Sequence, residues 1–160
     1  MVMSPYFAKL RMKVGTDLLL MPGVSVLIWD SDGRLLLVAD STSGLWGLVG
    51  GAIEPDEDPE DAARREAFEE VGVSVEITGL RAVLGGPSYR IRYDNGDEVS
   101  YVSTVYDARI DSREPLPDCD EVHEVRWFGP KEMATLNLDS FAAATLEALA
   151  ILLLGCSTRF

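Results

Sequence analysis

Three glutamates, Glu66, Glu69 and Glu70, are the residues of this chain with the clearest capacity for chemistry. Their spacings of three and four residues put all three carboxylates on one face of a helix. Like charges at these spacings repel one another, so a positive partner is expected among them. Carboxylate oxygens are hard ligands, and Mg²⁺ and Mn²⁺ are matching cations. The spacing therefore indicates a divalent metal site, although three such residues alone are more typical of a solvated acidic helix face.

The neighbouring residues predict a helix from Pro59 to Val71. Asp58 is a good N-cap, because its carboxylate can accept hydrogen bonds from the exposed amides of the first turn. Pro59 suits the first helical position, where a missing N–H costs nothing. Gly72 suits the left-handed position that ends a helix.

Arg65 lies next to Glu66 in sequence but about 100° away around the helix. We therefore expect Arg65 to hold Glu57, in the preceding loop, rather than to neutralise the three glutamates. Such a salt bridge would fix the loop against the helix.

The defined positions extend from Gly51 to Val73. They read, in order, Gly51, five residues, Glu57, seven residues, Arg65-Glu66, an apolar residue, any residue, Glu69-Glu70, any residue, Gly72 and an apolar residue. This pattern resembles the Nudix box, and every position is filled. The resemblance implies a Nudix hydrolase, a metal-dependent enzyme that acts on phosphoric anhydride bonds and splits a nucleoside diphosphate linked to another group. It also implies an α/β fold, an α/β/α sandwich with a mixed, mainly antiparallel sheet.

The resemblance implies a set of metal ligands, namely the backbone carbonyl of Gly50 and the carboxylates of Glu66, Glu69 and Glu70. Family members often add an acidic residue from a later loop. Glu121, six residues before Trp127, is our candidate, with a solvated loop acid as the equal alternative. One departure precedes the box, where Val49 stands in place of the proline that many relatives carry.

The implied chemistry is substitution at phosphorus by water. Mg²⁺, with Mn²⁺ as a substitute, would bridge the diphosphate and lower the pKa of a bound water. A glutamate would take the proton from that water. Glu66 and Glu69 are the first candidates for this base, and Glu121 is a third. Arg65 and Glu57 are assigned to the supporting salt bridge.

The substrate is less well determined by the sequence. Some Nudix subgroups carry a tyrosine or a proline shortly after the box, and here Tyr89 lies sixteen residues after Val73, with Pro87 two residues earlier. The tyrosine favours dinucleoside polyphosphates and the proline favours ADP-ribose, so this marker is ambiguous. The resemblance as a whole implies a nucleoside triphosphate, ADP-ribose or a nucleotide sugar as the substrate.

Gly51, Tyr89 and Arg90 are the candidate substrate-binding residues, and Arg90 could meet a phosphate. Trp46 and Tyr101 are further aromatic candidates for stacking on a base. Aromatic residues of this kind lie more often in the core.

Two functions other than catalysis are also compatible with parts of the sequence. A Nudix fold can serve as a non-catalytic nucleotide-binding or sensor module, but such modules usually lose box carboxylates, and all are kept here. An acidic protein that binds Ca²⁺ or a basic partner is the third reading, and no EF-hand spacing supports it.

Composition excludes several partners. The net charge of −13 over 160 residues argues against a nucleic-acid partner, because phosphate backbones need basic patches. Cys119 and Cys156 form no metal-type spacing, so a reducing cytoplasm is the simpler expectation. The apolar run Phe141–Leu154 is too short for a comfortable membrane span. It could bury surface in a homodimer, although core packing would explain it equally well.

The elements that must position the site follow from strand and turn patterns. We expect an N-terminal extension at 1–20 and a single Nudix domain at 21–160 that includes a C-terminal helix. The predicted strands are Gly23–Asp30 and Arg34–Asp40, joined as a hairpin by Ser31-Asp32-Gly33, then Val75–Leu84, Tyr89–Tyr93, Glu98–Ala108 and Glu124–Phe128. Asn95-Gly96 predicts a second hairpin turn. Helices are predicted at Pro130–Leu136 and Leu138–Leu154.

Overall fold

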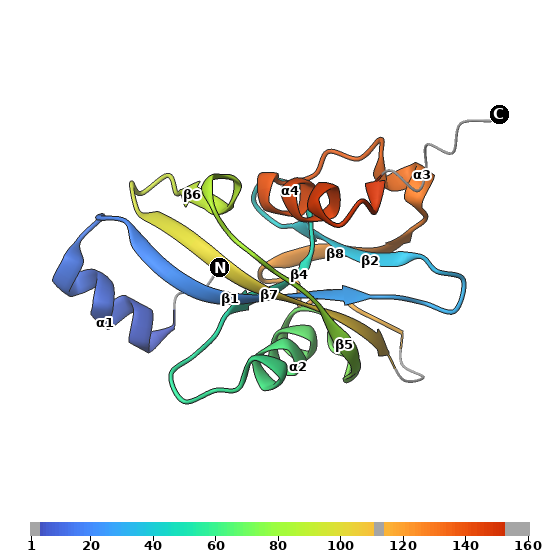
Figure 1. The fold of residues 1–160 in the computed structure, drawn as a ribbon, viewed down its shortest axis with the longest axis horizontal. Helices are drawn as coiled ribbons and strands as arrows, with labels where there is room; N and C mark the ends of the chain where they lie inside the picture. Colours follow the sequence, from blue (N-terminus) through green and yellow to red (C-terminus); the bar gives the residue numbers. More distant parts are fainter. Residues whose placement is uncertain (1–3, 111–113, 153–160) are drawn as a thin grey trace.

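The computed structural model describes residues 4–110 and 114–152. Its elements in chain order are α1 (Pro5–Val14), β1 (Leu19–Ile28), β2 (Leu35–Asp40), β3 (Trp46–Gly47), β4 (Val49–Ala52), α2 (Pro59–Val71), β5 (Val75–Leu84), the short 3₁₀ helix η1 (Pro87–Tyr89), β6 (Arg90–Arg92), β7 (Glu98–Ile110), β8 (Val122–Phe128), α3 (Pro130–Met133) and α4 (Ser140–Ala148) (Figure 1). The bounds predicted for α2 and β5 are confirmed.

One mixed sheet contains β4, β1, β7 and β5 in that order, and β6 pairs with β7. β1 and β7 run parallel from the pair Leu19–Val99 to the pair Ile28–Ala108. The other pairings in this sheet are antiparallel. Parallel strands need a long crossover, and here the chain between β1 and β7 supplies β2 to β6 and α2.

A second, antiparallel sheet has the order β3-β2-β8. The predicted hairpin between β1 and β2 is wrong beyond its turn. The turn is present, with the Gly33 N–H donating to the Asp30 carbonyl at 3.2 Å, but in the described chain the two strands share only the bridge between Trp29 and Leu35. Residues 24–28 and 35–39 are buried throughout, and each strand lies between two neighbours in its own sheet.

The predicted turn between β6 and β7 is confirmed. The Tyr93 N–H donates to the Asp97 carbonyl at 2.9 Å, and Gly96 has φ 88°. A positive φ of this size is costly for residues other than glycine, which explains the Asn-Gly pair.

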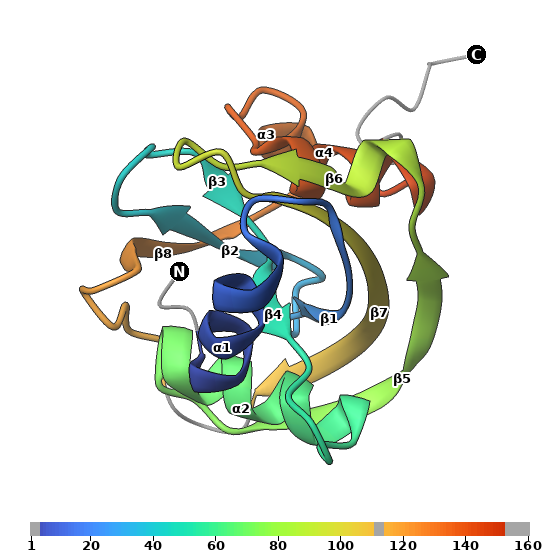
Figure 2. The same cartoon turned by 90° about the vertical axis from the view of Figure 1, so that its left-hand side faces the viewer.

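Helices cover both sides of the strands. α2 lies on one side, and α3 and α4 lie on the other (Figure 1). Viewed from the end that carries α1, β7 and β5 curl around β1 (Figure 2). This arrangement confirms the predicted α/β sandwich with a mixed, mainly antiparallel sheet.

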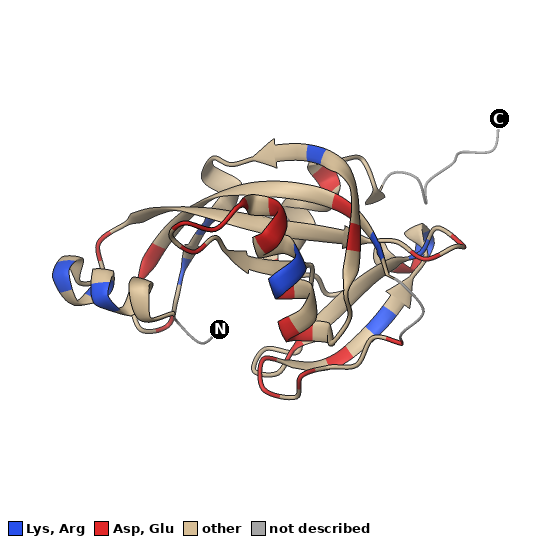
Figure 3. Ribbon diagram, turned by 90° about the horizontal axis from the view of Figure 1, so that it is seen from below, with Lys and Arg blue, Asp and Glu red and all other residues tan. Residues whose placement is uncertain are grey.

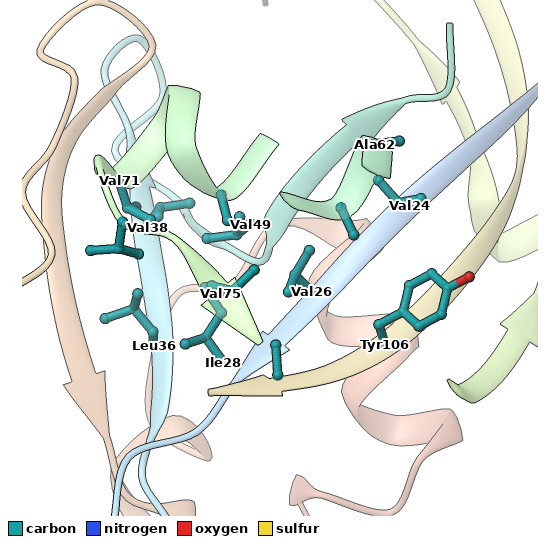
Figure 4. Close-up of a cluster of buried hydrophobic side chains, with 14 of the residues drawn as sticks. Val24, Val26, Ile28, Leu36, Val38, Val49, Ala62, Val71, Val75 and Tyr106 are labelled. Atoms are coloured by element: carbon teal, nitrogen blue, oxygen red, sulfur yellow. The ribbon is translucent and has the colours of Figure 1, made fainter. Parts of the chain in front are cut away.

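The main core joins β1 and β2 to the inner face of α2 (Figure 4). Val26, Leu36 and Val71 are fully buried there. Burying one aliphatic side chain of this size stabilises the fold by about 1.5–3 kcal/mol. The core therefore fixes α2 against the sheets and holds its outer face at a defined place.

α1 lies within residues 1–20, for which the sequence predicts only an extension, and β3 and β4 are likewise not among the predicted strands. Ser4 caps α1, since its Oγ accepts from the Phe7 N–H at 3.4 Å, and Pro5 occupies the first helical position. Phe7 is buried beside Met21 and Tyr101 in a separate apolar cluster. α1 is thus anchored to the start of β1.

The C-terminal helix is shorter than predicted. α4 spans Ser140–Ala148, and the last two residues of the predicted range, at 153 and 154, lie outside the described residues. Asp139 caps α4 by accepting from the Ala142 N–H at 2.7 Å. In the described chain, no helix is long and apolar enough to cross a membrane.

Candidate active site

α2 carries the three glutamates on the side that borders β4, and among them only Glu69 is exposed. Its buried face consists of small or branched residues, namely Ala62, Ala63, Ala67 and Val71. Seen from the side of α2, acidic residues colour this helix and the loop that precedes it (Figure 3). Gly72 ends the helix at φ 68° and ψ 14°, as predicted. The predicted side-chain cap is wrong, because the Asp58 carboxylate makes no cap hydrogen bond and only its backbone carbonyl accepts from Asp61 and Ala62.

Two glycines allow β4 to approach these carboxylates. Gly50 has φ 153°, and a Cβ at this position would overlap the Val24 carbonyl oxygen of β1. A Cβ on Gly51 would overlap the carboxylate of Glu66. The glycines therefore let the backbone of β4 lie directly beside the acidic face of α2.

Arg65 holds the loop before α2, as predicted. Its Nε donates to Glu57 Oε1 at 2.7 Å, and its second amino group donates to Glu57 Oε2 at 2.9 Å and to the Ala52 carbonyl at 3.0 Å. Hydrogen bonding to Arg65 lowers the pKa of Glu57, and the same pairing raises the pKa of Arg65. This bidentate pair ties the loop to both the helix and β4.

Arg65 also contacts the glutamates, which corrects part of the prediction. Its other amino group lies 2.8 Å from Glu66 Oε1 and 3.1 Å from Glu69 Oε2. The long guanidinium reaches around the helix, so the angle between positions 65 and 66 does not separate them. Arg65 therefore neutralises part of the acidic face while it holds Glu57.

Glu70 is the least satisfied acid of the site. Its Oε2 is enclosed and has no hydrogen-bond partner. Burial raises the pKa of Glu70 well above its usual value, and the charge of Glu66 raises it further, while the Gly50 N–H lowers it. Burial also raises the pKa of Glu66. An enclosed carboxylate oxygen without a partner is costly, and a cation is the natural group to satisfy it.

A later loop completes this region. The Asp118 N–H donates to the Glu70 carbonyl at 3.2 Å, which docks the loop on the end of α2. Asp118 Oδ1 accepts from the backbone N–H groups of Asp120, Glu121 and Val122 at 3.0, 3.1 and 2.9 Å. The loop is thus folded around the Asp118 carboxylate, which fixes the backbone of Glu121.

The loop that contains Asp118, together with β4 and α2, encloses a cavity of about 270 Å³, which we call the acidic cavity. Its lining residues are Gly50, Gly51, Glu66, Glu69, Glu70, Asp118 and Glu121. Every metal ligand expected from the sequence therefore borders one space. Asp118 joins them, although sequence reasoning preferred Glu121 among the acids of this loop.

The donor set fits a hard divalent cation, because it consists of carboxylates and a backbone carbonyl. The unpartnered Oε2 of Glu70 supports the same fit. Within residues 4–110 and 114–152, however, no three acidic, histidine or cysteine side chains already surround a single point. Glu69, whose side chain is 57% exposed, has room to rotate toward an ion.

Tyr89 and Arg90, two predicted substrate contacts, are not brought to the acidic cavity. Tyr89 is buried and packs edge-to-face on Phe141, with ring centroids 5.0 Å apart. Arg90 is exposed and pairs with Glu98 of β7. Trp46 likewise packs on another aromatic ring, that of Phe128.

A larger chamber of about 620 Å³ adjoins the acidic cavity, and Glu69 lines both. We call it the α1 chamber, because α1 contributes Phe7 and Arg11 to its wall. Tyr101 also lines it, although its side chain is buried and its ring packs edge-to-face on Phe141. The Ser4-Pro5 pair was the available signal for α1, since serine and proline often start helices.

A family model described as the NUDIX domain matches residues 19–149. This chain belongs to the Nudix hydrolase family. Nucleoside triphosphatase NudI of Salmonella typhimurium is 30% identical over 124 residues, which cover 72% of this chain and 87% of that protein.

Two solved structures support this family assignment. A MutT Nudix hydrolase from Burkholderia pseudomallei has a TM-score of 0.67 and 30% identity, covering 81% of this chain and 97% of that one. An ADP-ribose pyrophosphatase from Streptococcus suis has a TM-score of 0.64 and 25% identity, covering 88% and 94%. This Nudix hydrolase is therefore a hydrolase of phosphoric anhydride bonds that acts on nucleotide derivatives.

Proposed function

We propose that this Nudix hydrolase is a divalent-metal-dependent pyrophosphohydrolase, and that its substrate is a nucleoside triphosphate. The observation that carries the metal dependence is the enclosed Oε2 of Glu70, which has no partner inside a cavity lined by carboxylates. The substrate class follows NudI, which is named a nucleoside triphosphatase. Because one of the similar structures is an ADP-ribose pyrophosphatase, ADP-ribose is the second substrate class to be tested.

Glu66, Glu69 and Glu70, with the Gly50 carbonyl, would hold Mg²⁺ or Mn²⁺, and Glu121 or Asp118 would add a ligand from the later loop. The bound ion would supply charge stabilisation at the diphosphate and a more acidic water.

The chain's own groups have distinct roles in this proposal. Glu69 is the first candidate for the base that takes the proton from the attacking water, because its exposed carboxylate borders both the acidic cavity and the α1 chamber. Glu66 is packed against Gly51 and its side chain is only 13% exposed, which suits a ligand better than a mobile base. Arg65 and Glu57 position the loop and β4.

The test is a hydrolysis screen with Mg²⁺ over nucleoside triphosphates, ADP-ribose, nucleotide sugars and dinucleoside polyphosphates. Glu69→Gln and Glu70→Gln should each lower turnover of the best substrate at least about 100-fold, which is typical for loss of a catalytic acid or base. Glu147→Gln on the exposed side of α4 is the matched control and should keep full activity. Binding of nucleotides without turnover of any would instead support the sensor module.

A further inference from the structure

α1 supplies one wall of the α1 chamber and precedes the residues that match the family model, which begin at 19. The Burkholderia structure is covered over 97% of its own length by only 81% of this chain. Phe7 of α1 faces the same apolar cluster as Tyr101 of β7. The chamber is therefore completed by an element beyond the part of the chain that defines the family.

Arg11 fixes this wall. Its two amino groups donate to the backbone carbonyls of Asp17 at 2.7 Å, Gly15 at 3.2 Å and Glu98 at 2.8 Å. Its Nε lies 3.5 Å from Asp97 Oδ2. The guanidinium thus joins α1 to β7, and each of its three nitrogens already contacts an acceptor within the protein. Arg11 is a structural cation and offers no clamp for a phosphate.

Among the described residues, the second cation of the chamber wall is Arg65, and it too is paired within the protein. Arg65 is engaged by Glu57, Glu66, Glu69 and the Ala52 carbonyl. Against these two paired guanidinium groups, the chamber wall contains four carboxylates, those of Glu54, Glu69, Asp94 and Asp97. A second phosphate would meet repulsion here, because anions in a partly dehydrated cleft need unpaired donors.

The chamber instead suits a flat, uncharged ring. Its volume of about 620 Å³ lies within the usual range for sites that bind small organic ligands. Phe7, Tyr93 and Tyr101 provide aromatic surface in its wall, and bases stack on such surface. The Tyr93 and Tyr101 hydroxyls bond to each other at 3.0 Å, which fixes both rings.

We propose that the α1 chamber binds the base of the nucleotide, and that its carboxylates select bases with an exocyclic amino group over uracil and thymine. This inference rests on the proposed function, because it places the diphosphate in the adjoining acidic cavity. We assign Asp94 as the carboxylate that accepts a hydrogen bond from the exocyclic amino group of the base. It lies in the exposed turn between β6 and β7 and lines the chamber.

The chemical reason is which group donates and which accepts each hydrogen bond. A carboxylate accepts from the exocyclic amino groups of adenine, cytosine and guanine, whereas uracil and thymine carry a carbonyl oxygen in place of that group and offer only the ring N3–H as a donor. Asn95 does not compete with Asp94 for the base, since its amide donates to Asp97 at 3.1 Å and its carbonyl accepts from the Asp97 N–H at 3.0 Å. Both ends of this amide are thus used internally.

The experiment measures equilibrium binding of adenosine, cytidine, guanosine, uridine and thymidine by ligand-observed NMR in EDTA, because a phosphate would be repelled by the carboxylates of the metal-free acidic cavity. The amino-bearing bases should bind at least about tenfold more tightly than uridine and thymidine. Asp94→Asn should reduce this ratio, because the amide presents a donor as well as an acceptor. Phe7→Leu should weaken all five ligands together. Glu147→Gln is the charge-matched control.

Equal affinities for the five nucleosides would overturn the inference, and so would a ratio that Asp94→Asn leaves unchanged. Absence of binding to all five, in protein that hydrolyses nucleoside triphosphates, would overturn it while the proposed function stands. Selective binding in protein that hydrolyses nothing would support the base site and reject the proposed function. The two proposals therefore fail in distinguishable ways.

Discussion

The carboxylate of Glu66 lies against Gly51 so closely that a Cβ on Gly51 would come within 2.5 Å of its Cδ and 2.7 Å of its Oε2. Gly51 therefore leaves room for the Glu66 carboxylate of the site, whereas Gly50 leaves room for the backbone of β1. A Cβ on Gly50 would meet the Val24 carbonyl oxygen and lie 3.0 Å from Ser25 Cα, and its φ is 153°. These two neighbours predict different phenotypes for the same small substitution.

Gly51→Ala should lower kcat at least about tenfold, which corresponds to about 1.4 kcal/mol in the barrier. Its stability should fall by less than about 1 kcal/mol, because a flexible carboxylate can move aside. Gly50→Ala should lose about 3 kcal/mol of stability, since the clash is with backbone at a strained φ. Urea unfolding and steady-state kinetics of both variants measure the contrast. A Gly51→Ala variant with full activity would remove the proposed role of this contact.

Stability of the metal-free protein should fall as the pH rises from about 4.3, the unfolded value for glutamate, through the raised pKa of Glu70. Over this range the folded state binds more protons than the unfolded state, so the free energy of unfolding decreases as the pH rises. Glu57 has the opposite effect, because its pKa is lowered and its stabilisation is lost on acidification.

Glu70→Gln isolates the first effect. In EDTA at pH 8 it should melt about 2 °C above the wild type, which corresponds to about 0.5–1 kcal/mol for a chain of this size. The gap should close as the pH is lowered, because Glu70 then becomes protonated in the wild type. Thermal unfolding at several pH values measures this. A variant that melts below the wild type at pH 8 would contradict the account of Glu70.

The pair of Arg65 and Glu57 should show a coupling of about 1 kcal/mol in a double-mutant cycle with Arg65→Lys and Glu57→Gln. The pair is bidentate, but the Arg65 side chain is 29% exposed, so solvent screens part of the interaction. Arg65→Lys cannot reproduce two parallel hydrogen bonds. Chemical denaturation of the four proteins gives the coupling, and a value near zero would mean that the pair does not hold the loop.

Asp118→Ala should weaken Mn²⁺ binding about tenfold or more, because the backbone of Glu121 loses its support. The stability cost should be about 1 kcal/mol, as expected for exposed backbone hydrogen bonds to a charged acceptor. Asp118→Asn keeps the acceptor oxygen and should restore most of the affinity. Mn²⁺ titration by electron paramagnetic resonance measures both. If the asparagine variant binds as weakly as the alanine variant, the charge of Asp118 acts directly and its loop-folding role is not the cause.

The elements around the site could be predicted because their signals are local. Pro59, the spacing of the glutamates and Gly72 define α2, and the Asn95-Gly96 pair defines the turn before β7. The pairing of the strands could not be predicted, because alternation of apolar residues does not say which strand lies beside which. β1 and β2 are buried on both faces and are drawn into different sheets, despite the turn between them.

The site was predicted where the box defines it and missed where tertiary contacts define it. Arg65 reaches Glu66 because its side chain is long, which a helical wheel does not represent. Tyr89 matched a subgroup position but packs on Phe141, since burial determines its neighbours. α1 lies outside the box altogether, and its approach to β7 depends on the contacts of Arg11 with distant backbone carbonyls.

The most direct test of the central claim is turnover of the best nucleoside triphosphate by EDTA-stripped protein as Mg²⁺ is added back, with Glu70→Gln and Glu147→Gln beside the wild type. The account predicts no turnover without the ion, saturable activation in the wild type and in Glu147→Gln, and no recovery in Glu70→Gln at any Mg²⁺ concentration. Equal turnover with and without Mg²⁺, or full activation of Glu70→Gln, would contradict a metal site built on the acidic cavity.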